Sequence, residues 1–506
     1  MSSAVSRKPY NSRISVYAIQ YKDDTLCGLS LCLSNFISDQ VLSGRDETWR
    51  RHKMESVWMK HMEIRKREAL SGDREAPVVV IGAGLAGILT AYYLEQAGIR
   101  ALVLEADRIC SGQTKNTTAK ITSQHNLVYD YLIRTFGRSM AEHYARVNEE
   151  AIREYERLIG EKAIDCDFVR CPACLYSERE TEVLKREAEA AKSLGIKASF
   201  RTDCELPFPV AGVTRFEGQA RFHPLKFLAR LAEEVEVYEQ TKVLRVEDHR
   251  VETDRGCVTA EHIVFAAHYP FVNVPGYYFA RMYQERSYVV ALENVERPEG
   301  MYLGIDREGL SFRSCGNMLL LGGGSHRTGT NQKDRPGGGC RYEMLRRKAK
   351  ELYPGCHEVL RWSAQDCMTL DGLPYIGRFS RAKPDWYVAT GFGKWGITTA
   401  MVSARILTAL IDGRDCPEVD IFSPGRRFTA QAAKELAVHG AHTVKGLMKH
   451  LLPAGDREIG PNCPHMGCRL EWNPEEGTYD CPCHGSRFDK EGHLIDGPAQ
   501  TDCRRR

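Results

Sequence analysis

The segment "VVVIGAGLAGILTAYYLEQAGIRALVLEAD" (78–107) constrains the fold of this chain more than any other stretch. Gly82, Gly84 and Gly87 follow an apolar run and open a stretch with helical apolar spacing. Glu105 closes a second apolar run, and such continuous runs are typical of buried parallel strands. A G-x-G-x-x-G turn between strand and helix, with an acid ending the next strand, predicts a dinucleotide-binding α/β fold.

Each residue of this motif has a physical role. Gly82 allows the tight turn, Gly84 lets the backbone approach a pyrophosphate, and Gly87 allows close helix packing. The helix N-terminus attracts phosphate groups, and Glu105 is expected to accept hydrogen bonds from a ribose. The motif alone does not distinguish NAD from FAD. Residues 319–326, "LLLGGGSH", are also glycine-rich but lack this spacing, so we expect no second site for NAD(P)H.

Three further segments extend the pattern: "CSGQTKNTTAKIT" (110–122), "QARFHPLKFLARL" with "EQTKVLRVEDHRVETDRGCVTAEHIVFAAHYP" (219–270), and "DGLPYIGRF" with "DWYVATGFGKWGITTAMVSARILTALIDG" (371–413). With the glycine motif, they resemble the D-amino-acid oxidase-like FAD-dependent oxidoreductases, relatives of glycine and sarcosine oxidases, over residues 76–415. "TTAKIT", "WSAQD" and "GFGKWG" are similar to the branch of that family that is fused to a Rieske domain. The resemblance implies an α/β fold, in which an FAD-binding Rossmann-like domain of the glutathione-reductase type accompanies an α+β substrate domain.

The resemblance also implies which residues bind FAD. They comprise the motif residues, two threonines near the pyrophosphate and flavin, a backbone contact to adenine, and residues at the flavin end: Gly82, Gly84, Gly87, Glu105, Thr117, Thr118, Val243, Gly377, Gly393, Gly396 and Ile397. A last helix would begin near Gly396, with its N-terminus toward the pyrimidine side of the flavin, where negative charge gathers on reduction.

A cysteine- and histidine-rich segment, "NCPHMGCRLEWNPEEGTYDCPCHGSRF" (462–488), lies near the C-terminal end. Cys463 and His465 form one group, and Cys481 and His484 form the other. Four such ligands suit zinc or an iron–sulfur cluster. One Cys and one His per group favours a two-iron cluster, with two thiolates on one iron and two imidazoles on the other. A structural zinc knuckle is the alternative.

The segment resembles the signature of Rieske [2Fe-2S] domains, which implies a small all-β module. The resemblance implies that Cys463, His465, Cys481 and His484 are the cluster ligands and that Cys468 and Cys483 form a disulfide. Ser486 occupies the place of a serine that donates a hydrogen bond in high-potential members. Phe488 stands where those members carry a tyrosine donor, so a potential in the lower part of the Rieske range is expected.

The chain divides by composition and motif into four expected parts. Residues 1–53 show no motif or periodicity and are expected to be a disordered extension or a start-site artefact. Residues 54–423 form the FAD-dependent oxidoreductase, with an FAD part (about 76–140, 217–275 and 362–415) and a substrate part (about 141–216 and 276–361). A helical linker (424–455) leads to a shortened Rieske domain (456–506), which is too small to fold without support from the rest of the chain.

Composition excludes several classes of partner. The 506 residues carry 70 Lys and Arg against 67 Asp and Glu, which gives no reason to expect nucleic acid or an acidic membrane. No apolar run reaches the ~18 residues that span a bilayer. Most of the 18 cysteines are irregularly spaced and predict free thiols in the cytoplasm. The exception is the CPAC pair, Cys171 and Cys174, for which two free thiols are expected and a redox-active pair or half a zinc site is the alternative.

The amino-acid oxidases of this family carry an arginine shortly before "T-x-D-G-x-P", which binds the substrate carboxylate. Asp366 stands there in "RWSAQDCMTLDGLPYIG". An amine, or a carboxylate held by Arg313 or Arg327, is therefore expected as the substrate. The polar residues expected nearest the flavin, and hence the candidate catalytic residues, are Gln365, Asp366 and Lys394.

The sequence thus predicts oxidation of a small amine- or amino-acid-like molecule, with electrons passing between FAD and the Rieske cluster. The external partner would be an electron-transfer protein or a quinone-like acceptor. The alternative is a flavoprotein in which the cluster is a redox sensor or a structural element.

Overall fold

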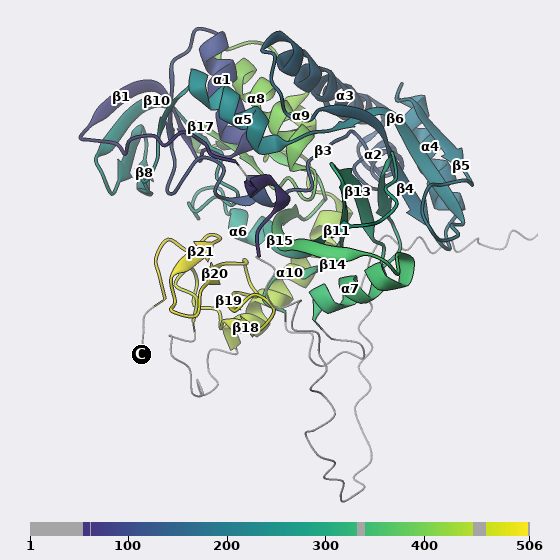
Figure 1. Ribbon diagram of the computed structural model, residues 1–506. Coiled ribbons are helices and arrows are strands. Elements are labelled where there is room, and N and C mark those ends of the chain that lie inside the picture. The colour runs from purple at the N-terminus through teal and green to yellow at the C-terminus, as the bar shows by residue number, and fades with distance from the viewer. Residues whose placement is uncertain (1–53, 61, 331–339, 449–461, 504–506) are drawn as a thin grey trace, which may run out of the picture. The chain divides into compact units, whose positions relative to one another are not determined.

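The computed structural model describes residues 54–60, 62–330, 340–448 and 462–503 (Figure 1). The predicted extension, residues 1–53, lies outside the described residues. The described residues belong to one compact unit. Within the described ranges, the strands form three sheets.

The predicted βαβ unit lies inside an eight-stranded sheet. Its main path runs β16 (Tyr375–Ser380), β17 (Lys383–Thr390), β10 (Cys257–Phe265), β1 (Arg74–Ile81), β2 (Ala101–Leu104) and β7 (Glu236–Tyr238). The hairpin β8 (Val243–Glu247) and β9 (Arg250–Thr253) joins it at β10. β1 pairs in parallel with both β2 and β10, and residues 78–81 are buried, as expected for a central parallel strand.

The second sheet has nine strands and is mostly antiparallel. Its path runs β15 (His357–Thr369), β11 (Met282–Glu293), β14 (Met318–Arg327), β13 (Ser311–Cys315), β12 (Met301–Gly304), β4 (Val169–Ser177), β6 (Gly212–Arg221) and β3 (Lys120–Ile121), with β5 (Ala198–Arg201) beside β6. The glycine-rich residues 319–326 lie within β14, so they form a sheet strand instead of a nucleotide-binding turn.

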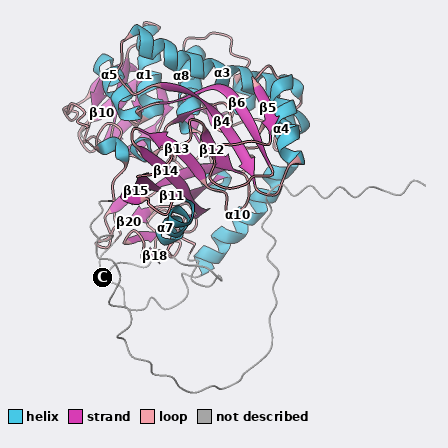
Figure 2. Ribbon diagram, turned by 45° about the vertical axis from the view of Figure 1, so that its right-hand side comes forward, coloured by secondary structure: helices cyan, strands magenta, loops and turns pink. Residues whose placement is uncertain are grey.

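Helices lie on more than one side of these sheets (Figure 2). They are α1 (Leu85–Gln96), α2 (Tyr129–Phe136), α3 (Arg138–Glu161), α4 (Glu182–Ser193), α5 (Pro224–Leu231), α6 (Tyr278–Arg281), α7 (Arg341–Leu352), α8 (Gly396–Ile411), α9 (Val419–Phe422) and α10 (Ala430–Met448). Short 3-10 turns lie at η2 (Val57–Met59), η3 (Gln113–Asn116) and η4 (Ala232–Glu234). In the part of the chain that the structure describes, no helix is long and apolar enough to cross a membrane.

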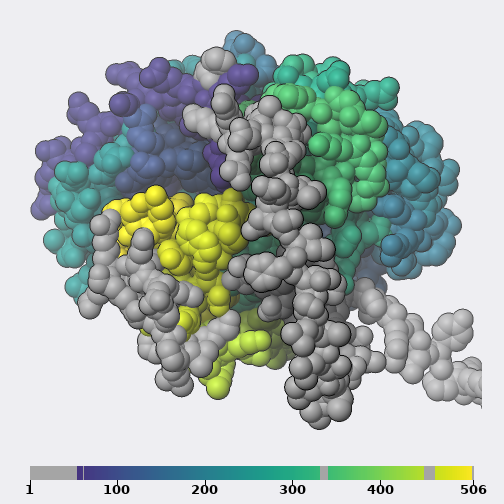
Figure 3. Space-filling model, turned by 60° about the horizontal axis from the view of Figure 1, so that its bottom comes forward, coloured from purple at the N-terminus to yellow at the C-terminus, as the bar shows by residue number. Residues whose placement is uncertain are grey.

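A four-stranded antiparallel sheet forms the C-terminal module, residues 462–503. Its strands are β18 (Glu471–Asn473), β19 (Thr478–Asp480), β20 (Arg487–Phe488) and β21 (Leu494–Asp496), and all of them follow the first Cys/His group. Figure 3 shows this module, in yellow, against the body, residues 54–423. The two larger sheets with their helices, together with this small sheet, confirm the predicted α/β fold with an all-β C-terminal module.

Candidate functional site

The glycine turn has the geometry that a dinucleotide requires. Gly82 adopts φ +107°, and a Cβ there would lie 3.1 Å from the backbone of Ala266. A Cβ on Gly87 would lie 1.8 Å from the carbonyl oxygen of Gly82. Gly84 is the N-cap of α1, whose first turn contains no acidic residue. The main-chain nitrogen of Leu85, the first residue of α1, donates to Thr114 Oγ1 at 3.1 Å. With its close glycine backbone and no acidic residue in its first turn, this helix N-terminus fits the ADP part of FAD.

Glu105 lies at the end of β2, beside this turn. Its carboxylate accepts hydrogen bonds from the main-chain nitrogens of Ala83 (2.8 Å) and Asp107 (3.0 Å). Burial raises the pKa of Glu105, and these two hydrogen bonds oppose that effect. Because a carboxylate has about four acceptor positions, it can still accept from a ribose.

The β2–β3 loop, residues 105–119, carries the two predicted threonines. The indole of Trp58 donates a 2.6 Å hydrogen bond to the carbonyl oxygen of Thr117, and Trp362 donates one of 2.9 Å to that of Asn116. Thr118 follows directly. Two buried indoles thus fix the backbone at the place expected for the pyrophosphate and flavin.

Helix α8 begins at Gly396, as the resemblance implied, so Gly393, Gly396 and Ile397 lie together at its start. Trp395 caps the helix and stacks on His125, with ring centroids 5.0 Å apart. His125 in turn contacts the carbonyl oxygen of Thr122 at 2.7 Å. The α8 N-terminus is therefore fixed to the segment that follows the β2–β3 loop.

Two other predicted FAD residues lie on strands. Val243 is buried at the start of β8, opposite Thr253. Gly377 lies in β16 with φ +135°, and a Cβ there would point toward Val419 of α9, 3.1 Å away. Neither residue lies on the start of α8 itself.

Asp366 and Lys394 contribute to a charged cluster next to α8. Asp366 on β15 is in register with Glu285 on the adjacent strand β11. Lys394 Nζ lies 3.4 Å from Glu285 Oε2 and donates to Ser325 Oγ at 2.7 Å. Burial raises the pKa of Asp366 to about 6, although Lys394 opposes this shift. Arg327 of β14 lies directly opposite Glu285 in the sheet, so this cluster holds two carboxyl groups, one ammonium and one guanidinium. Asp366 forms no ion pair with any described residue, so it is the carboxyl group that could accept a cationic ligand.

The other candidate polar residues have different surroundings. Gln365 points away from Asp366, because consecutive strand residues face opposite sides, and its Nε2 donates to the carbonyl oxygen of Gly485 (2.9 Å). Arg327 donates to the carbonyl oxygens of Pro482 and Cys483. Both therefore contact the C-terminal module. Arg313 donates to the carbonyl oxygen of Phe222 (2.9 Å), and its guanidinium lies over Trp58, 4.9 Å from the ring centroid.

The four predicted cluster ligands lie together in the C-terminal module. Cys463 and Cys481 are buried, and the Cys481 thiol donates to the Cys463 sulfur, which lowers the pKa of Cys463. The His465 and His484 rings lie 5.0 Å apart. Burial lowers the pKa of His465 to about 4 and that of His484 well below its usual value, so both imidazoles are neutral. His465 Nδ1 and both ring nitrogens of His484 are buried without a hydrogen-bond partner, as expected of metal ligands.

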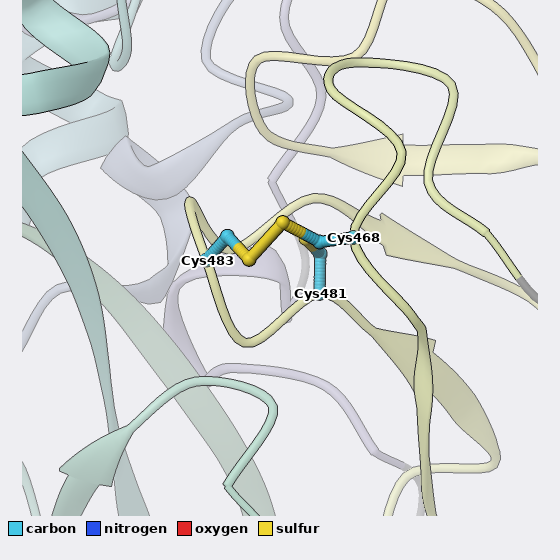
Figure 4. A group of neighbouring side chains, drawn as sticks. All are labelled: Cys468, Cys481 and Cys483. Atoms are coloured by element: carbon cyan, nitrogen blue, oxygen red, sulfur yellow. A yellow bond between two sulfur atoms is a disulfide. The ribbon is translucent and has the colours of Figure 1, made fainter. Parts of the chain in front are cut away.

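Cys468 and Cys483 form the predicted disulfide (Figure 4). The sulfur atoms of Cys468, Cys481 and Cys483 all lie within 4.8 Å of one another. Because Cys468 and Cys483 are bonded to each other, they cannot serve as thiolate ligands. The geometry therefore favours the set of two cysteines and two histidines. A Cβ on Gly446 of α10 would lie 2.6 Å from Cys483 Sγ, so α10 packs directly on the disulfide.

Sequence reasoning missed the residues that hold the module on the body. Gln284 and Arg286 of β11 contact the module, as does Gln113 of η3. The only sequence signal for Gln284 and Arg286 is the presence of polar residues in a β-branched and aromatic strand, whereas Gln113 lies in a turn of the β2–β3 loop. The pair Cys171 and Cys174 lies in β4 as buried free thiols, and burial raises the pKa of Cys174 to about 12.

Comparison with known proteins identifies both parts of the chain. Residues 77–410 match the family described as FAD dependent oxidoreductase, and residues 458–505 match the Rieske [2Fe-2S] domain. The chain is 34% identical over 493 residues to the "Putative Rieske 2Fe-2S iron-sulfur protein YhfW" of Bacillus subtilis, covering 88% of this chain and 96% of that protein.

More distant relatives share the body. The chain is 22% identical over 400 residues to "Gamma-glutamylputrescine oxidoreductase" of Escherichia coli, covering 70% of this chain and 91% of that protein. Glycine oxidase from Geobacillus kaustophilus has the same fold, with a TM-score of 0.58 at 20% identity over 70% of this chain and 99% of its own. The cofactors are FAD and a [2Fe-2S] cluster. The chain is therefore an oxidoreductase that belongs to the FAD dependent oxidoreductase family and carries a C-terminal Rieske [2Fe-2S] domain.

Proposed function

We propose that this protein oxidises a small cationic amine at its FAD and passes the electrons through its Rieske cluster. The observation that carries the proposal is the paired carboxyls of Glu285 and Asp366, which lie beside Lys394 near the start of α8. A carboxylate at position 366 repels the carboxylate of an amino acid and attracts an ammonium group. A relative named gamma-glutamylputrescine oxidoreductase supports an amine as the substrate class.

The predicted FAD residues around the turn, the β2–β3 loop and α8 would hold the cofactor. When bound, FAD accepts two electrons as a hydride, whereas a Rieske cluster carries one electron at a time. Glu285 and Asp366 would orient the amine, and Asp366 in its ionised form would hold the ammonium group. An electron-transfer protein or a quinone-like molecule would then take electrons from the cluster, one by one.

The module lies on the same strands as this acid pair. β11 and β15 carry Glu285 and Asp366 on one face and contact the module through Gln284 and Gln365 on the other. This arrangement supports an electron outlet next to the substrate site.

An anaerobic titration of the holoprotein tests the proposal. Primary amines and diamines should bleach the flavin absorbance, and the electron paramagnetic resonance (EPR) signal of the reduced cluster should follow. Glycine and other zwitterionic amino acids should bleach the flavin absorbance far less. Equal bleaching by amino acids would contradict the substrate class. A reduced flavin beside a permanently oxidised cluster would instead favour a sensor or structural role for the cluster.

A further inference from the structure

The body holds the second ligand loop of the module through its main chain. Four consecutive carbonyl oxygens, those of residues 482–485, accept hydrogen bonds from body side chains. Arg327 donates to Pro482 (3.1 Å) and Cys483 (3.0 Å). Gln284 donates to His484 and Gln365 donates to Gly485, each at 2.9 Å. Strands β14, β11 and β15 therefore orient the loop that carries the ligand His484, in the way that outer-shell partners orient metal ligands.

Gln365 also contacts the β2–β3 loop, where the pyrophosphate and flavin are expected. Its main-chain nitrogen donates to Gln113 Oε1 at 2.9 Å, and Gln113 Nε2 donates to Asp496 of the module at 2.6 Å. Thr328 donates to Gln365 Oε1 at 3.2 Å, and the Gln365 side chain is 1% exposed. Because water is excluded and both ends of its amide are bonded, Gln365 is held in one orientation.

Gln113 belongs to the β2–β3 loop. It begins the turn η3, which ends one residue before Thr117, the residue expected beside the pyrophosphate and flavin. Gln365 precedes Asp366 of the acid pair. A continuous chain of covalent and hydrogen bonds thus runs from the β2–β3 loop through Gln113 and Gln365 to Gly485, the residue after the ligand His484.

We infer that Gln113 and Gln365 are positioning residues that connect the flavin to the cluster for electron transfer. This inference rests on the proposed function. In each transfer, one electron leaves the reduced flavin and one ferric iron of the cluster becomes ferrous. A second transfer follows once an external one-electron acceptor has reoxidised the cluster. Electron transfer slows steeply across through-space gaps, so a bonded route at fixed separation favours it.

The test uses the holoprotein and needs no amine. Under anaerobic conditions, light in the presence of EDTA reduces the protein's own flavin, and rapid freezing followed by EPR then measures cluster reduction. Gln365→Leu and Gln113→Leu should each slow this transfer by about ten- to a hundred-fold, the range typical of lost outer-shell partners. The double variant should be no slower than the slower single variant, because both residues lie on one route.

Lys242→Met provides the matched control. Lys242 Nζ donates to the carbonyl oxygen of Gln500 in the module at 2.6 Å, away from the two glutamines. This variant also loses one hydrogen bond between body and module, but it should transfer electrons at the unsubstituted rate. The FAD content, iron content and EPR line shape of each variant show whether the module is still docked and its cluster intact.

The outcomes separate the inference from the proposed function. If the unsubstituted protein moves no electron from flavin to cluster, the proposed function fails, and the inference fails with it. If the unsubstituted protein does transfer electrons to the cluster, and both glutamine variants transfer them at the same rate, the inference alone is wrong. If Gln365→Leu loses its cluster, Gln113→Leu decides the question, because it leaves every hydrogen bond to residues 482–485 in place.

Discussion

Arg286 of β11 and Glu476 of the C-terminal module form an ion pair with 2.6 Å between Nη1 and Oε2, and their side chains are 1% and 3% exposed. Arg487 and Asp480 of the module complete the cluster: Arg487 lies 2.7 Å from Glu476 and 3.3 Å from Asp480. Arg286 is thus the body's contribution to a buried network of two cations and two anions.

Replacing Arg286 should detach or destabilise the module. Arg286→Met leaves two buried carboxylates with one cation, and breaking a buried pair in this way costs about 3–5 kcal/mol. We expect an earlier urea transition and loss of iron with FAD retained. The control is Arg138→Ala, which removes an exposed pair with Glu142. Similar iron contents in the two variants would show that the network is not needed for docking.

The same network predicts acid sensitivity of the module. Burial by itself raises the pKa of Glu476 and Asp480, but Arg286 and Arg487 more than reverse that effect, so both pKa values lie below their usual range. Their stabilisation is therefore complete above the ordinary carboxyl pKa of about 4 and is lost as pH falls through the lower folded values. Iron release below pH ~4 should precede global unfolding. Simultaneous loss of iron and far-ultraviolet circular dichroism would contradict this.

Amine binding should depend on pH through Asp366, whose pKa is raised to about 6. The ionised form attracts an ammonium group, so the apparent Kd should fall as pH rises from 5 to 7. Asp366→Asn should remove this dependence and weaken binding, whereas the exposed Asp248→Asn should leave it unchanged. Conversely, the raised pKa means that Asp366 disfavours folding increasingly as pH rises from its ordinary pKa of 3.8 to about 6, and fully above that, so Asp366→Asn should raise the Tm more at pH 7 than at pH 4.5. An unchanged pH profile in Asp366→Asn would remove Asp366 from the site.

Exchanging one cluster ligand should change the potential without losing the iron. In His484→Cys, a thiolate replaces a neutral imidazole, which should move the reduction potential toward the roughly −400 mV of all-cysteine clusters. An EPR-monitored redox titration measures the shift, with the remote variant His262→Gln as control. Zinc without acid-labile sulfide in the unsubstituted protein would instead support a zinc site.

The first described residues should be needed for FAD retention, whereas residues 1–53 should not. Trp58 is 2% exposed, bonds to Thr117 and lies under Arg313. Trp58→Leu should release FAD on dilution, as measured by flavin fluorescence. Removal of residues 1–53, with Met54 as the first residue, should keep FAD bound. Loss of flavin after that removal would show that the extension contributes to the site.

A local motif in the sequence predicted the dinucleotide turn, and the family resemblances implied the start of α8 near Gly396 and the Cys468–Cys483 disulfide. These features depend on short-range chemistry. A tight turn needs glycine where φ is positive or a Cβ would collide, as at Gly82 and Gly87, and paired ligand loops need Cys and His at fixed spacing. Such requirements are visible within a few residues of one another.

Only the tertiary structure placed Gln365 against the module and Asp366 beside Glu285. Neighbours in a strand face opposite sides, and which side meets the flavin depends on the sheet register and on what packs against each face. Likewise, Arg286 meets Glu476 across 190 residues of chain. Local motifs by themselves indicated a dinucleotide cofactor and a metal cluster, and the family resemblance specified FAD. The docking of the C-terminal module on the body depends on long-range pairing of polar side chains. This pairing becomes favourable only when folding buries both partners together.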